Sequence, residues 1–132
     1  AIADWLERSS SAGGRLGLIG YGEGGLLALY TSALDPRFQV TCVSGCFGTR
    51  EDTWQQPLDR NVFGLLQQFG DAELASLIAP RALIVEAAQA PDAVFSGDKG
   101  GAPARLVTPD LASVRREVER AQALTARLGL HL

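Results

Sequence analysis

The residues of this sequence whose spacing most clearly matches functional motifs form a glycine-rich turn at positions 20–25 (GYGEGG), between two apolar segments. Gly20, Gly22 and Gly25 match the pattern G-x-G-x-x-G, which in dinucleotide-binding proteins joins a strand to a helix. That function also needs an acidic residue near the end of the next strand, where it binds the ribose hydroxyls. The next predicted strand ends at residues 43–46 (VSGC), without a carboxylate, and Asp35 precedes it. Without this acidic residue, Rossmann-type nucleotide binding is a weaker interpretation of the turn than the one that follows.

The same turn matches a second pattern, the nucleophile elbow G-x-S-x-G, in which a nucleophile stands between a strand and a helix. Gly20 and Gly24 occupy the two positions expected to be small, which places Gly22 at the nucleophile position. Shifting the frame to make Glu23 the nucleophile would put Tyr21 at a small position, so Glu23 is excluded. Glycine has no side chain that could attack a carbonyl. It does relieve the strain of the elbow backbone, which costs a residue with a Cβ on the order of 1–3 kcal/mol.

The segments around the turn predict alternating strands and helices. Apolar or β-branched runs without polar alternation are typical of strands buried on both faces of a parallel sheet. Asn61 and Asp71 are expected to cap two helices, and the Gly- and Pro-rich residues 90–109 are expected to form a flexible loop. The predicted strands are residues 15–20, 38–44 and 82–85, and the predicted helices are residues 1–9, 26–34, 62–69, 71–78 and 111–128.

Two stretches resemble a known superfamily. Residues 15–45 are similar to the elbow strand, helix and following strand of α/β-hydrolases, and residues 77–85 (LIAPRALIV) resemble a strand of their dienelactone hydrolase and acetyl xylan esterase-like members. The order of elements agrees over nearly the whole chain. The resemblance implies a partial α/β-hydrolase fold, a three-layer sandwich of parallel strands with helices on both faces. It also implies carboxylic ester hydrolase ancestry, a small-molecule ester or carbohydrate-derived ligand, and no cofactor.

The family pattern also indicates where the partners of a nucleophile would lie. The acid would follow the third strand, where Glu86 and Asp92 are the nearby carboxylates, although Asp92 comes later than in the family. The base would be a His after a fourth strand, whereas His131 stands at the start of that presumed strand. We therefore expect no complete catalytic set. Two functions remain open: part of an esterase-like hydrolase, or a pseudohydrolase that binds a ligand or a partner.

Three side chains near the turn have both a structural and a functional interpretation. Glu23 is expected to complement the dipole of the following helix rather than to act in catalysis. Tyr21 is expected to pack beneath the elbow rather than to contact a substrate. Trp54 either lines a pocket or anchors an irregular loop.

The composition of the chain argues against several classes of function. The chain has 132 residues and a formal net charge of −3, which argues against nucleic-acid and membrane-surface binding. No apolar run approaches the ~20 residues of a membrane-spanning helix. Two cysteines and one histidine provide neither a disulfide framework nor a metal site of several histidines. Methionine is absent even at position 1, so we expect residues 1–132 to be one partial domain that continues into the remainder of a parent chain.

Overall fold

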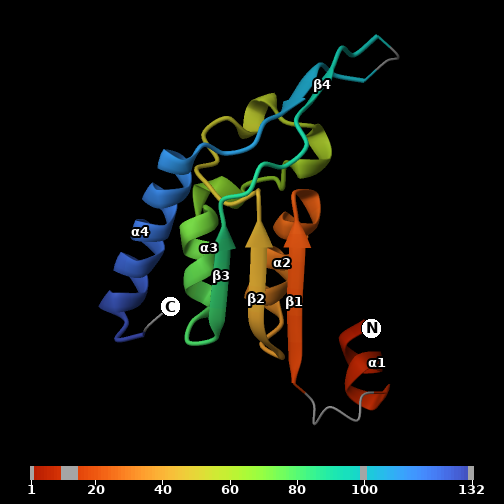
Figure 1. Ribbon diagram of the computed structural model, residues 1–132. Helices are drawn as coiled ribbons and strands as arrows, with labels where there is room; N and C mark the ends of the chain where they lie inside the picture. The colour runs from red at the N-terminus through yellow and green to blue at the C-terminus, as the bar shows by residue number, and fades with distance from the viewer. Residues whose placement is uncertain (1, 10–14, 99–100, 131–132) are drawn as a thin grey trace.

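A three-stranded parallel sheet forms the centre of the molecule (Figure 1). The computed structural model describes residues 2–9, 15–98 and 101–130. Strands β1 (Leu16–Tyr21), β2 (Phe38–Ser44) and β3 (Ala82–Glu86) pair in that order. Helix α2 (Glu23–Leu34) connects β1 to β2, and α3 (Asp71–Ile78) precedes β3. Parallel strands joined through helices confirm the predicted α/β class, and the arrangement is that of part of an α/β-hydrolase fold.

The main hydrophobic core lies between one face of this sheet and the helices. Helix α2 packs against β1 and β2, while α3 packs against α2 and against α4 (Leu111–Arg127). Leu29, Val43, Phe47 and Ile78 are the largest apolar side chains that are fully buried there. A smaller cluster joins α1 (Ile2–Ser9) to the start of β1 and β2. The core therefore fixes the strand ends from which the glycine-rich turn emerges.

The opposite face of the sheet is largely exposed. Ile19, Val40 and Ile84 lie on this face and are 77%, 39% and 53% exposed. Side chains alternate between the two faces of a strand, so the apolar runs place every second residue here. The expected burial of the strands on both faces is therefore not met within the described residues, where α2 and α3 cover the other face.

Residues 90–109 contain a hairpin that the sequence analysis did not predict. Strands β4 (Ala93–Phe95) and β5 (Ala104–Leu106) pair antiparallel and project beyond the carboxyl ends of the central strands (Figure 1). Each strand has only three residues, too few for an alternating pattern to stand out among the prolines and glycines. The flexibility expected of residues 90–109 stays a prediction.

Two predicted helix starts need correction. The helix expected at residues 62–69 is only the short 3₁₀ turn η3 (Leu65–Gln67), preceded by Gly64 with φ 74°. A left-handed residue interrupts helical geometry, and glycine adopts it readily. Helix α3 forms as predicted, but Gly70 rather than Asp71 precedes it, and the Gly70 amide donates to Glu73 Oε2 over 2.8 Å. The Asp71 carboxylate has other partners.

Candidate functional site

The glycine-rich turn joins the end of β1 to the start of α2, with Gly22 at its apex. Gly22 has φ 55° and ψ −116°, a conformation that L-residues with a Cβ rarely adopt. Its amide donates to the Ser44 carbonyl oxygen over 2.8 Å, and its own carbonyl oxygen accepts from Gly25 and Leu26 at the start of the helix. The unusual backbone geometry predicted for Gly22 is confirmed.

The glycines around the apex differ in how much space they have. A Cβ on Gly20 would overlap the backbone of Gly24, and a Cβ on Gly25 would lie 2.6 Å from Cys46 Sγ. A Cβ on Gly24 would have no neighbour within 4 Å among the described residues. The predicted need for a small residue therefore holds at Gly20 and is wrong at Gly24. Gly25 is the second position where the turn requires glycine.

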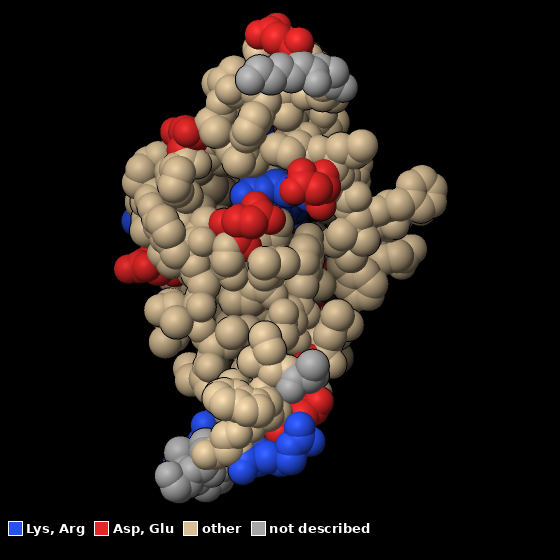
Figure 2. Space-filling view, turned by 90° about the vertical axis from the view of Figure 1, so that its right-hand side faces the viewer, with Lys and Arg blue, Asp and Glu red and all other residues tan. Residues whose placement is uncertain are grey.

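A large open pocket lies above the turn, with a volume of about 1230 Å³. Its floor includes Gly22 and Gly45, and its walls come from residues 49–61 and from the β4–β5 region. Figure 2 shows a mostly uncharged face in which basic atoms lie in a hollow beside acidic groups. The pocket thus stands at the carboxyl ends of the strands, where parallel α/β proteins usually bind their ligands.

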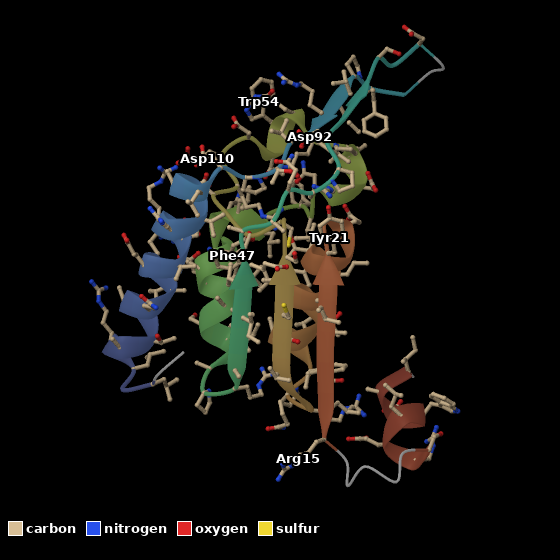
Figure 3. All side chains as sticks on the ribbon, in the orientation of Figure 1. Arg15, Tyr21, Phe47, Trp54, Asp92 and Asp110 are labelled. Atoms are coloured by element: carbon tan, nitrogen blue, oxygen red, sulfur yellow. The ribbon has the colours of Figure 1, made fainter. Side chains whose placement is uncertain are left out.

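Trp54 and Tyr21 both lie at this end of the sheet (Figure 3). Trp54 lines the pocket, and its side chain is 78% exposed, which favours the pocket-lining interpretation over a role in anchoring the loop. Tyr21 is 53% exposed, and its hydroxyl donates to the Gln89 carbonyl oxygen over 2.5 Å. The expectation that Tyr21 packs beneath the turn is therefore wrong. Its side chain instead links the turn to the segment after β3.

Glu23 is the first residue of α2 and forms an ion pair with Arg60 across the pocket wall. Arg60 Nε donates to Glu23 Oε2 over 2.5 Å, and the Arg60 side chain is only 15% exposed. A carboxylate at a helix N-terminus also complements the helix dipole. Both contacts support a structural role for Glu23.

Both candidate acids accept hydrogen bonds from neighbouring segments. The Glu86 carboxylate accepts from Ser44 Oγ over 2.5 Å at the end of β3, and Asp92 accepts from the Thr108 amide over 2.8 Å. Neither carboxylate is among the described residues that line the pocket. The residues nearest to the place of a Cβ on Gly22 are Ala90 and Pro91, at 3.7 and 3.8 Å. His131, the other residue considered for a catalytic role, lies outside the described residues.

The structure contains a buried ion pair that the sequence analysis missed. Arg50 Nε donates to Asp71 Oδ1 over 2.8 Å, and the Gly48 amide donates to Asp71 Oδ2 over 3.0 Å. The two side chains are 10% and 1% exposed. Burial raises the pKa of the Asp71 carboxyl, while the Arg50 guanidinium lowers it. Arg50 also lines the pocket, so this pair connects the pocket wall to the start of α3.

The cysteines and other acidic groups offer little further chemistry. Both cysteines are free, and burial raises the pKa of the Cys46 thiol to about 11. The thiol form is a poor nucleophile and a poor metal ligand. Within the described ranges, no three His, Cys, Asp or Glu side chains are grouped so as to hold a metal ion. No helix in the described part of the chain is long and apolar enough to cross a membrane.

Comparisons with known proteins relate this geometry to hydrolases. No family model matches the chain. The chain is 41% identical over 86 residues to "Putative hydrolase YtaP" of Bacillus subtilis (strain 168), an alignment that covers 59% of this chain and 28% of the relative. Among solved structures, it resembles the glucuronoyl esterase from Solibacter usitatus, with a TM-score of 0.57 and 20% identity. That match covers 97% of this chain and 34% of the esterase.

The chain thus spans about a third or less of the length of these two relatives. The structural match shows the fold alone, while the sequence match provides the link to a hydrolase. The chain therefore shares the α/β fold of an esterase and resembles a hydrolase in sequence over 86 residues.

Proposed function

We propose that this chain descends from carboxylic ester hydrolases and now binds a ligand above the turn without hydrolysing it. One observation carries the proposal: Gly22 stands at the apex of the turn, with φ 55° and ψ −116°, on the floor of the pocket. In an esterase of this fold, a side chain at the apex attacks the ester carbonyl. A glycine there leaves the turn intact and removes the attacking atom.

The other groups near the pocket support the loss of hydrolysis. A nucleophilic hydroxyl or thiol needs a base or a lowered pKa, whereas the pKa of the Cys46 thiol is raised to about 11 by burial. The Thr49 hydroxyl lies 3.1 Å from the hydroxyl of Ser113, which is not a base. The candidate acids Glu86 and Asp92 are engaged by Ser44 and Thr108. A hydrolytic set would have to come from elsewhere in a longer protein.

The pocket itself supports the binding role. It combines the exposed ring of Trp54 with polar side chains and remains open over the turn. We propose a small-molecule ester or a carbohydrate-derived compound as the ligand, in line with the resemblance to dienelactone hydrolases and acetyl xylan esterases. The glucuronoyl esterase with a similar fold is itself named for a sugar-derived ester.

The experiment compares the full-length protein with its Gly22→Ser variant on a small activated ester, such as p-nitrophenyl acetate. We expect no saturable turnover from either protein, because a serine hydroxyl without a base is a weak nucleophile. Ligand-observed NMR on the same samples measures whether small molecules bind near Trp54, with Trp54→Ala as the binding control. Saturable turnover by the unmodified protein would refute the proposal. Turnover by Gly22→Ser alone would mean that a base is present and that only the nucleophile was lost.

A further inference from the structure

The Arg50 guanidinium has an N–H donor without an acceptor in the part of the chain that the structure describes. Only one of its five N–H groups, on Nε, donates to Asp71, whose other oxygen accepts from the Gly48 amide. Nη2 is buried and has no acceptor among the described residues. A buried donor without an acceptor costs about 1–3 kcal/mol, so a group that supplied an acceptor there would be bound favourably.

A second unsatisfied group lies in the wall of the same pocket. Gln56 Oε1 is buried and has no donor among the described residues. Arg50 and Gln56 both line the pocket above the turn. The two groups are opposite in kind, because a guanidinium N–H needs an acceptor and an amide oxygen needs a donor. One ligand could satisfy both only if it carried both functions.

Because Asp71 fixes the orientation of the Arg50 guanidinium, Arg50 favours a negatively charged hydrogen-bond acceptor such as a carboxylate. The Asp71 side chain, 1% exposed, fixes the guanidinium through Nε, and the Arg50 side chain is itself only 10% exposed. A guanidinium presents its N–H groups in a planar fork that matches the two oxygens of a carboxylate. The other arginine in the pocket wall, Arg60, is already paired with Glu23. Of these two arginines, Arg50 is the one with a buried N–H donor that has no acceptor among the described residues.

From these contacts we propose that the pocket binds a hydroxylated carboxylate, with its carboxylate at Arg50 and a hydroxyl group donating to Gln56. Asp71 is a positioning residue that holds the guanidinium. This inference rests on the proposed binding function and specifies the ligand class for the same pocket. It involves no covalent step.

The test uses three six-carbon probes and the full-length protein. D-gluconate carries a carboxylate and hydroxyls, sorbitol has the hydroxyls without the carboxylate, and hexanoate has the carboxylate without the hydroxyls. Ligand-observed NMR gives the dissociation constants. We expect gluconate to bind roughly tenfold to a hundredfold more tightly than sorbitol, and at least severalfold more tightly than hexanoate.

Two variants locate the effect. Arg50→Met combined with Asp71→Asn removes both charges of the buried pair together, which avoids leaving either one uncompensated. We expect it to abolish the preference for gluconate over sorbitol. Gln56→Leu leaves the ion pair untouched and should reduce the preference for gluconate over hexanoate. Arg116→Gln, at an exposed position of α4, is the matched control and should change neither preference. Circular dichroism verifies that each variant is folded.

The outcomes separate this inference from the proposed function. Equal affinity for gluconate and sorbitol would overturn the assignment of Arg50 while leaving ligand binding in place. An unchanged preference in the folded double variant would overturn it as well, and so would the absence of binding by all three probes. Ester turnover by the unmodified protein would instead refute the proposed function, whatever the probes show.

Discussion

The amide of Gly22 lies 2.8 Å from the carbonyl oxygen of Ser44, to which it donates a hydrogen bond. This bond fixes the apex of the turn to the carboxyl end of the neighbouring strand β2. The Gly45 amide in turn donates to the Glu86 carbonyl oxygen over 2.9 Å, which extends the connection to β3. Glycine can adopt this conformation because it has no Cβ, and the hydrogen bonds to the sheet hold it there.

Replacing Gly22 by alanine should destabilise the protein without a steric clash. The added Cβ would have its nearest neighbours at 3.7 and 3.8 Å, an ordinary contact distance. The cost comes from the backbone at φ 55° and ψ −116°, which is on the order of 1–3 kcal/mol for a residue with a Cβ. Chemical denaturation measures the change. A variant as stable as the original would mean that the turn relaxes, and that glycine is not required by its geometry.

Two other glycines of the turn should respond in opposite directions to the same substitution. A Cβ on Gly20 would overlap the Gly24 backbone, so Gly20→Ala should prevent the turn from forming as it is. Gly24 belongs to α2 and has open space around it. Gly24→Ala should therefore stabilise the protein by about 0.4–1 kcal/mol, because alanine loses less conformational entropy on folding. Thermal unfolding gives the Tm of both variants. A lower Tm for Gly24→Ala than for the original protein would contradict the structure.

The sequence predicted those features that depend on local patterns. The apolar runs predicted all three central strands, and the glycine spacing predicted the strained apex at Gly22. Both are set by residues that are adjacent in the chain, where backbone conformation and side-chain alternation leave a direct trace. The hairpin at β4 and β5 left no such trace, because three residues per strand are too few to alternate.

The pocket chemistry was less predictable, because it depends on residues far apart in the chain. Arg50 and Asp71 are 21 positions apart, and neither residue indicates the other in the sequence. The sequence predicts Asp71 as a helix cap because it stands at the start of a helix, a position that carboxylates often occupy. Tyr21 is expected to pack beneath the elbow, yet its hydroxyl reaches Gln89, 68 positions away.

The Arg50–Asp71 pair should show strong coupling in a double-mutant cycle. Asp71→Asn or Arg50→Met alone leaves one buried charge without its partner, a loss of about 3–5 kcal/mol in such sites. Replacing both should restore most of the stability, because no uncompensated charge remains. Urea denaturation of the two single variants and the double variant gives the coupling free energy. Additive losses would show that the two side chains do not depend on each other.

A second ion-pair network should make stability depend on pH in the acid range. Arg37 forms ion pairs with Asp35 and with Asp4 of α1, and its hydrogen bonds lower the pKa of both carboxyls from 3.8 to about 2. In the unfolded chain these carboxyls keep their ordinary pKa, so they take up protons at a higher pH than in the folded protein. The stabilisation is therefore present above about pH 4 and is lost as the pH falls toward 2.

Thermal unfolding at about pH 5 and about pH 2.5 measures this effect, which follows from the difference in proton uptake between the two states. We expect the acid-induced drop in Tm to be smaller in Arg37→Gln than in the original protein, and unchanged in the control Arg116→Gln. The contribution should shrink with added salt, because these side chains are partly exposed and their charges are screened. The same acid-induced drop in Arg37→Gln would mean that Arg37 does not lower these pKa values. A stabilisation that grew as the pH fell from 4 to 2 would contradict the direction of both shifts.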